Sequence, residues 1–318
     1  MKILKMLKTL LINRRNLLLL VALIITASMS YASEAQSVYS YGRFQPGSTV
    51  YLFGDNVNMR EKPATKAPIV RLLSIGSRLT IVGEPDGDYK ANGFSSGWYR
   101  VQFLDQQKPV EGYVWGGLLA FGAVQFAGAD KELLLLAGIT KFAENRPAGE
   151  LRVVENSKVK AKTPFTWIVT DMNEGDNYSY SVAAEELSWA GVADLKNVFQ
   201  ISCNYEACGY TRGKLLFFWD GNNLFCGPTA ESVSEAGLFS VESEYVFPGQ
   251  EGCKSNELIL RTTSIEEPAE DGTTPGTAKK VEILHVWNGK DWVAKAPVET
   301  ELPAPVRESA SSGDSEGN

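Results

Sequence analysis

The stretch "NVNMREKPATKAPIVRLLSIGSRLTIVGE", residues 56–84, decides the fold of the first half of the chain. It alternates short apolar and β-branched runs with Pro, Gly and charged residues, a pattern typical of half-buried antiparallel strands joined by turns. Similar runs flank it, namely "TVYLFG" (49–54), "WYRVQF" (98–103) and "EGYVWGGLL" (111–119). Together these runs span about 70 residues, which predicts one small β-barrel over residues 49–120.

The motif residues of this segment resemble those of the bacterial Src homology 3 domain. Asn58, Arg60 and Pro63 match the opening motif of that family, and Gly76 matches the turn before its next strand. The middle and closing strands are matched by Trp98, Val101, Gly112, Tyr113 and Val114. The resemblance implies a binding module, often one that holds cell-wall peptides. Two segments, "PDGDYKANGFSSG" (85–97) and "DQQKPV" (105–110), are expected as loops longer than the family needs.

The candidate ligand-binding residues are Asn58, Arg60, Trp98, Tyr113 and Trp115. Tyr113 and Trp115 are two residues apart on an expected strand, so they share one face. With Trp98 nearby they could form the floor of a groove for an extended peptide. The alternative is that the aromatic rings pack the end of the barrel and that Asn58 and Arg60 orient its first turn.

The second half of the chain repeats one plan of strand, loop, strand, turn and strand. Val154, Trp219 and Trp287 occupy equivalent places, at intervals of 65 and 68 residues. The period predicts an antiparallel, propeller-like repeat domain over residues 124–296, similar to integrin-like FG-GAP repeats and other propeller blades. Three units are too few to close a propeller.

Smaller signals within this domain predict its turns and one insertion. The dipeptides Asp220-Gly221 and Asn288-Gly289 predict two-residue type I′ turns. The stretch 178–195, "YSYSVAAEELSWAGVADL", is expected to be an inserted short helix or a disguised further blade. Residues 297–318, rich in Pro, Ser, Gly and acids, are expected to form a disordered tail.

All four cysteines, Cys203, Cys208, Cys226 and Cys253, lie in the second half. An even number of cysteines in an exported chain predicts disulfides. We expect Cys203 to pair with Cys208 across a hairpin and Cys226 to pair with Cys253, although three connectivities are possible. A zinc site is the alternative, but these spacings lack the closely paired ligands of structural zinc sites.

Residues 1–32 have the charged head, the apolar run "LLLLVALIITA" and the small-residue cleavage site of a signal peptide. The apolar run is too short for a stable membrane anchor, so we expect a periplasmic or secreted protein. The whole chain has a formal charge of −7, and the leader holds five basic residues and no acids, which leaves −12 for the remainder. That charge argues against nucleic acid as a partner.

No catalytic constellation is evident in the sequence. The one histidine, His285, alternates with apolar neighbours and is expected to be a strand residue rather than the base of a nucleophile. The stretch "DMNEGD" (171–176) resembles a calcium loop but lacks the full set of ligands, and we expect no metal and no cofactor. A hydrolase that uses paired carboxylates stays an alternative.

The sequence therefore predicts an exported, non-enzymatic binding protein whose barrel recognises a peptidoglycan-derived or other peptide-like ligand in the cell envelope. The chain also resembles exported Gram-negative proteins in which such a barrel precedes an all-β C-terminal domain. The alternative is a scaffolding protein of the envelope whose barrel docks on its own second domain and which binds other envelope proteins.

Overall fold

The computed structural model describes residues 39–40, 43–128, 131–143, 146–166, 180–187, 191–192, 194–205, 207–269 and 273–305. Apart from one 3-10 turn, η1 (Gly116–Leu118), the regular elements of this part of the chain are all strands. The prediction of an all-β chain is confirmed. The expected leader, residues 1–32, and the candidate calcium loop, residues 171–176, lie outside the described residues.

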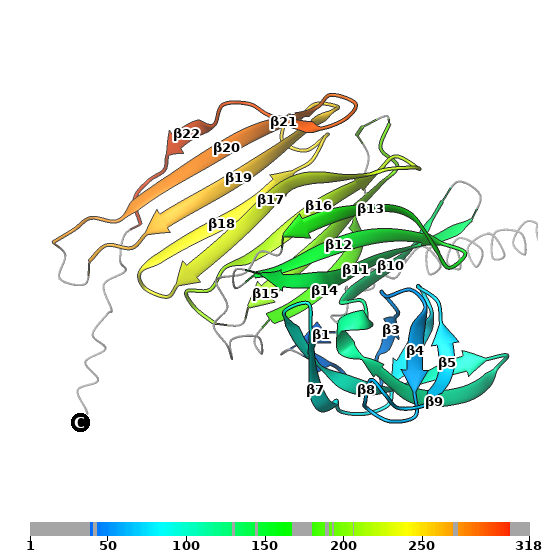
Figure 1. The fold of residues 1–318 in the computed structure, drawn as a ribbon. Coiled ribbons are helices and arrows are strands. Elements are labelled where there is room, and N and C mark those ends of the chain that lie inside the picture. Colours follow the sequence, from blue (N-terminus) through cyan, green and yellow to red (C-terminus); the bar gives the residue numbers. More distant parts are fainter. Residues whose placement is uncertain are drawn as a thin grey trace, which may run out of the picture. The chain divides into compact units, whose positions relative to one another are not determined.

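The barrel is a seven-stranded antiparallel sheet in the order β3-β6-β8-β9-β4-β5, with β7 paired to β8. Its strands are β3 (Thr49–Tyr51), β4 (Val57–Arg60), β5 (Ile69–Leu73), β6 (Arg78–Ile81), β7 (Asp86–Ala91), β8 (Phe94–Asp105) and β9 (Lys108–Trp115). Val57, Met59, Val101 and Val114 point inward and are buried. These alternate positions of the motif strands supply the core of the barrel. Figure 1 shows the arrangement of the strands.

Two segments expected as long loops are hairpins closed by tight turns. Ala91 pairs with Phe94 across Asn92 and Gly93, whose φ angles are 53° and 76°. Asp105 pairs with Lys108 across residues 106–107, which also both have positive φ. Positive φ at both central residues is the geometry of a type I′ turn. The first of these hairpins, β7–β8, extends the sheet beside Trp98.

The remaining strands form two further antiparallel sheets. The smaller contains β10 (Gly122–Ala127), β11 (Glu132–Ala143), β12 (Arg146–Glu155) and β13 (Lys158–Thr166). The larger is an eleven-stranded sheet in the described part of the chain. Its strands are β1 (Tyr39–Ser40), β2 (Arg43–Phe44), β14 (Tyr180–Leu187), β15 (Asn197–Tyr205), β16 (Arg212–Trp219), β17 (Leu224–Glu235), β18 (Phe239–Val246), β19 (Glu257–Glu266), β20 (Thr277–Trp287), β21 (Trp292–Ala294) and β22 (Val298–Glu301).

Strand β16 is buried on both of its faces. Phe217 and Trp219 belong to the core between the two sheets, where the Phe217 ring lies 5.7 Å from the ring of Phe165 on β13. Phe218 points the other way, into a second core that includes Trp287. The near-continuous apolar run of this strand is explained by this burial, because a strand covered on both faces needs no polar alternation.

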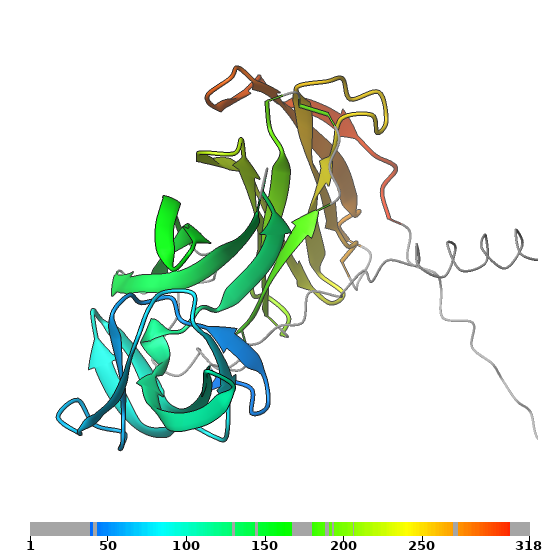
Figure 2. The same cartoon turned by 90° about the vertical axis from the view of Figure 1, so that its right-hand side faces the viewer.

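The predicted blades do not form. Strands β15–β16 and β19–β20, the second and third repeat units, are joined through β17 and β18 into one sheet, in which β14 to β20 follow in sequence order (Figures 1 and 2). Consecutive hairpins pair edge to edge, so no break separates one unit from the next. The first unit, β11–β12, belongs to the smaller sheet.

The two dipeptides expected to form type I′ turns lie in four-residue loops. Trp219 pairs with Leu224, and the Asp220 carboxylate accepts hydrogen bonds from the backbone amides of Asn222 and Asn223, at 2.6 and 2.7 Å. The loop at 288–291 has the same construction, with the Asn288 side chain in the place of Asp220. Asp and Asn side chains stabilise such turns because they replace a backbone acceptor.

Two further expectations are corrected in the same region. The stretch 178–195 contains strand β14, paired with β15 along its length, and its described residues form no helix. The tail expected to be disordered from residue 297 includes β22, which pairs with β20. Only residues 306–318 of that tail lie outside the described residues.

None of the four cysteines, all of which are described, forms a disulfide. Cys203 is fully buried in the core between the sheets, whereas Cys208 is exposed in the loop after β15. Cys226 is exposed on β17, with its Sγ 3.5 Å from Thr163 Oγ1, whereas Cys253 is buried. Each predicted pair therefore joins a buried thiol to an exposed one, and both predicted disulfides are wrong for this structure.

The barrel packs against the smaller sheet through one side. Phe53, Ile75 and Leu136 share a buried cluster. The Arg152 guanidinium lies 3.9 Å from the centroid of the Phe53 ring and donates a hydrogen bond of 2.7 Å to the Phe53 carbonyl oxygen. Gly138 on β11 makes room for that ring, because a Cβ at this position would lie 2.4 Å from Phe53 Cγ.

Candidate functional site

All five candidate ligand-binding residues lie on the outer face of the barrel. Trp98 is directly opposite Trp115 in the β8–β9 ladder, and Arg60 is directly opposite Tyr113 in the β4–β9 pairing. Directly opposed residues of antiparallel strands point to the same side of the sheet. Asn58 precedes Arg60 by two residues on β4, and Trp115 follows Tyr113 by two residues on β9. Because these strands are antiparallel, Asn58 and Trp115 lie on the same side of the Arg60–Tyr113 pair.

A row of side chains crosses four strands of this face. Arg100 on β8 faces Tyr113 on β9, Tyr113 faces Arg60 on β4, and Arg60 faces Ile69 on β5. We call these four residues the cross-strand row. Leu72 lies beside it on β5, opposite Asn58. The row places cationic, aromatic and apolar groups next to one another on a surface open to solvent.

The two tryptophans of the site are covered. Trp98 and Trp115 are 7% and 8% exposed. The Trp115 indole N–H points at the carbonyl oxygens of Tyr89 and Ser96, each at 2.9 Å, and the Tyr89 ring packs edge-on to it at 5.5 Å. The hairpin β7–β8 therefore covers this end of the face. The geometry gives these two rings a packing role, and ligand binding by them stays a prediction.

The two polar candidates remain within reach of solvent. Asn58 and Arg60 are both partly exposed. Arg60 donates one hydrogen bond of 2.7 Å from Nη1 to the Ala67 carbonyl oxygen, which orients the loop between β4 and β5. Among the described residues, no carboxylate lies within ion-pair distance of this guanidinium, whereas Arg100 is paired with Glu111 at 2.5 Å. Arg60 thus keeps donors available for an anionic group.

Two apolar residues of this face were missed by sequence reasoning. Ile69 and Leu72 are 56% and 57% exposed on β5, which ends the strand order of its sheet. An edge strand offers unpaired backbone groups, and exposed apolar side chains beside it suit an added extended strand. The signal was present in the stretch "IVRLL" (69–73), where outward positions of a strand carry large apolar side chains.

The glycines of the family motif have a structural cause. A Cβ at Gly112 would lie 2.6 Å from Met59 Cγ and 2.9 Å from the Arg60 carbonyl oxygen, so only glycine lets β9 approach β4 this closely. Gly76 has a φ of 77°, which glycine adopts without strain. These positions build the barrel that presents the cross-strand row.

The remaining chemistry of the described residues is limited. His285 is 9% exposed on β20; burial lowers its pKa, while hydrogen bonding to the backbone of Ile283 and Leu258 works in the opposite direction. The described part of the chain contains no group of three or more His, Cys, Asp or Glu side chains suited to a metal ion. It also contains no helix with the length and hydrophobicity needed to cross a bilayer.

The fold and the motif glycines define a small barrel of the Src homology 3 type. Residues 55–120 match the family described as Bacterial SH3 domain. This part of the chain is therefore a bacterial SH3 domain, as the sequence motifs predicted. Neither the curated proteins nor the solved structures contain a match to the chain.

Proposed function

We propose that the chain is an exported, non-enzymatic binding protein of the bacterial cell envelope, whose barrel recognises a peptidoglycan-derived or other peptide-like ligand. The observation that carries the proposal is the cross-strand row on the bacterial SH3 domain. The Arg60 guanidinium has no carboxylate within ion-pair distance among the described residues, and it lies with a tyrosine and exposed apolar side chains beside an edge strand. This arrangement suits an extended peptide that bears a carboxylate. The leader-like residues 1–32 support export.

The packing of the barrel on the smaller sheet leaves this face open. Phe53 and Ile75 make that packing contact, and neither belongs to the cross-strand row. Ile69 and Leu72 keep more than half of their surface exposed. The barrel can therefore hold a ligand without separating from the rest of the chain.

The test is co-sedimentation of residues 33–318 with insoluble peptidoglycan at moderate salt. We expect the chain to pellet, and we expect Tyr113→Ala and Arg60→Gln each to weaken binding by about tenfold, because each removes a partly exposed group of the proposed contact. Matched controls are Leu104→Ala, at a residue 63% exposed four positions from Arg100 on β8, and Arg78→Gln, at an exposed arginine on β6. Equal loss of binding in variants and controls would contradict the assignment of this face.

A second candidate function is favoured by the contact around Phe53. A barrel that docks on its own second domain suits a scaffolding protein of the envelope that binds protein partners. Gly138→Ala disturbs this contact, whereas Tyr113→Ala does not. The scaffolding role is the better account if the chain does not pellet with peptidoglycan and if Gly138→Ala, but not Tyr113→Ala, alters capture of envelope proteins.

A further inference from the structure

Strand β5 presents an open edge of the barrel. It ends the strand order of its sheet and, within the described part of the chain, pairs with β4 alone. The backbone of Glu61 donates a hydrogen bond of 3.0 Å to the Pro68 carbonyl oxygen. Hydrogen-bonded and open pairs alternate between antiparallel strands. In the next pair, Arg60 and Ile69, the backbone N–H and C=O of Ile69 therefore point away from β4.

The outward side chains of this edge are apolar. Ile69 and Leu72 are 56% and 57% exposed, and both lie on the side of the sheet that Arg60 shares. The one charged residue of β5, Arg71, is paired with Asp105 of β8 at 2.8 Å. Exposed edge strands are usually guarded by charges. Two other edge strands of the described chain, β13 and β22, carry such exposed charges: Lys158, Lys160, Lys162, Glu299 and Glu301.

A cation lies at the start of this edge. Arg60 Nη1 donates a hydrogen bond of 2.7 Å to the carbonyl oxygen of Ala67, two residues before β5, so the guanidinium extends to the Ile69 end of the strand. The nearest acid in sequence, Glu61, forms no ion pair with it. The stretch 62–83, which contains β5, has four basic residues and no acid. This end of the edge therefore suits a negative group of a ligand.

We propose that β5 binds the carboxyl-terminal segment of a polypeptide as an added antiparallel strand, with the terminal carboxylate at Arg60. The inference rests on the proposed function of the barrel as a peptide-binding module, and it specifies the chemistry of the peptide. A peptide antiparallel to β5 has its carboxyl end beside Ile69, where the guanidinium lies. In such strand addition the main-chain hydrogen bonds supply affinity, and alternate side chains of the peptide contact those of the edge strand.

The charges disfavour a second copy of this chain as the occupant. A copy paired through its own β5 would bring basic residues beside basic residues, because the stretch 62–83 contains no acid. A peptide terminus instead supplies the carboxylate that this edge lacks. The negative φ angles of a paired strand are those that L-residues adopt, so the occupant is a segment of L-residues.

The test is fluorescence anisotropy of residues 33–318 with labelled hexapeptides. The probe alternates threonine and valine, carries fluorescein at its amino end and ends in a valine with a free carboxylate. We expect its carboxamide form to bind about tenfold more weakly, because a hydrogen bond to a charged group is lost. Arg60→Gln should bind the two forms equally. The same peptide built from D-residues should bind at least about tenfold more weakly, because its strand has the mirror-image twist.

Backbone methylation tests the pairing itself. The N–H groups of a strand point alternately to its two sides, so an added strand turns only every second N–H towards β5. Two analogues of the probe carry N-methyl groups on the threonines or on the valines. We expect one analogue to lose about tenfold or more in affinity and the other to keep its affinity. Binding that survives in both analogues, or falls equally in both, contradicts strand addition.

Variants of the chain locate the peptide on β5. Leu72→Ala should weaken binding of the probe by about fivefold, because it removes part of the apolar contact. The matched control is Leu104→Ala, at a leucine 63% exposed on β8, which should bind as tightly as the unaltered chain. Circular dichroism checks that each variant is folded. Equal binding by Leu72→Ala and Leu104→Ala overturns the proposal, as does equal binding of the acid and the carboxamide.

The outcome for peptidoglycan distinguishes this inference from the proposed function. If none of the peptides binds while the chain still pellets with peptidoglycan, strand addition on β5 is overturned and the proposed function stands. If the chain neither binds the peptides nor pellets, both are overturned.

Discussion

The contact between Gly138 and Phe53 makes a sharp test of how the barrel is held on the smaller sheet. A Cβ at Gly138 would lie 2.4, 2.5 and 2.6 Å from three carbons of the Phe53 ring. Carbon atoms in contact are about 3.5–4.0 Å apart, so the ring would have to move by about 1 Å or more. The Arg152 guanidinium, 3.9 Å from the ring centroid, limits that movement. Gly138→Ala should therefore overpack the contact.

The magnitude follows from two opposing effects. Overpacking a core contact costs about 1–3 kcal/mol of the free energy of unfolding. Replacing glycine by alanine where the backbone is compatible returns about 0.4–1 kcal/mol, because the unfolded chain loses freedom. Gly138 has a φ outside the left-handed region, so this gain applies. We expect a net loss of about 1–2 kcal/mol, measured by urea unfolding followed by circular dichroism.

A double-mutant cycle separates the clash from other effects. Phe53→Ala alone should cost about 3–5 kcal/mol, since Phe53 is 4% exposed. In the double variant the clash is absent, so its cost should equal that of Phe53→Ala or be slightly smaller. Gly83→Ala is the control, because no atom lies within 4 Å of a Cβ there, and it should not destabilise the protein. Additive effects of Gly138→Ala and Phe53→Ala would refute the contact.

Three further predictions follow from the described residues. Mass spectrometry of the non-reduced, alkylated chain should count four thiols, and blocked thiols would refute this. Cys203→Ser should lower the melting temperature more than Cys208→Ser, because Cys203 is buried and Cys208 is exposed. Burial lowers the folded-state pKa of His285 below its ordinary value of 6.5, so the unfolded chain binds more protons than the folded chain near that pH. The free energy of unfolding should therefore fall as the pH is lowered from 7 to 5.5, and His285→Gln should reduce this dependence on pH. Trp115→Phe should cost about 1–3 kcal/mol, since it leaves the carbonyl oxygens of Tyr89 and Ser96 without their donor; an unchanged melting temperature with lost peptidoglycan binding would instead make Trp115 a ligand contact.

The barrel could be predicted because its determinants restrict the residue type at single positions of the sequence. Gly112, Gly76 and the inward positions of β4, β8 and β9 each have a steric or burial requirement that restricts the residue type. Strand alternation also placed Tyr113 and Trp115 on one face. The covering of Trp115 could not be predicted in the same way, because residues 85–97 were expected to form a loop, and it is their pairing in hairpin β7–β8 that brings Tyr89 and Ser96 to the indole.

The turns show how a dipeptide signal can mislead. Asp220-Gly221 and Asn288-Gly289 contain the residues favoured in type I′ turns, but their Asp and Asn side chains accept backbone N–H groups and build four-residue loops. In contrast, the tight turn between β12 and β13 uses Asn156 and Ser157, both with positive φ and neither a glycine. The strands on each side determine the register, and the turn residues adapt to it.

The repeat and the cysteines were misjudged because sequence spacing contains no information about which edges pair. Similar intervals between Val154, Trp219 and Trp287 arise from strands and hairpins of similar length, which suits a continuous meander as well as separate blades. Cys203 and Cys208 are close in sequence, but the first side chain lies in the core and the second is exposed. Cys203 lies on β15, where side chains alternate between the two faces of the sheet. Cys208 lies in the loop after this strand, where no such alternation predicts the direction of a side chain.

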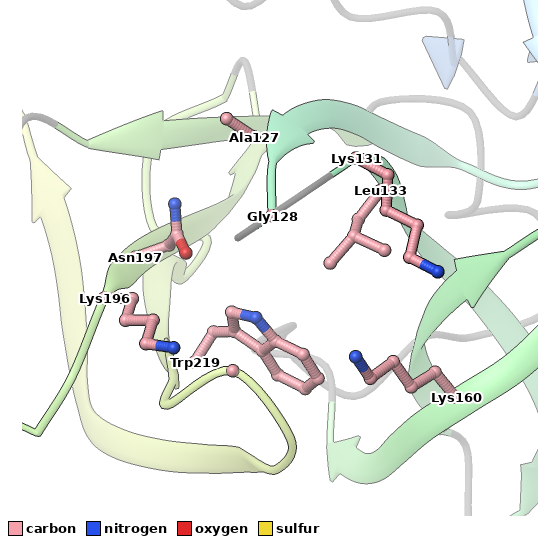
Figure 3. A pocket seen from close by; sticks show the side chains of 9 residues that line it. Ala127, Gly128, Lys131, Leu133, Lys160, Lys196, Asn197 and Trp219 are labelled. Carbon is pink, nitrogen blue, oxygen red and sulfur yellow. The ribbon is translucent and has the colours of Figure 1, made fainter.

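The pocket lined by Lys131, Lys160 and Lys196 (Figure 3) shows the same limit of sequence spacing. Lys131, Lys160 and Lys196 belong to segments separated by tens of residues, and no motif links them; the pairing of β12 with β13 and the packing of the two sheets bring them together around Trp219.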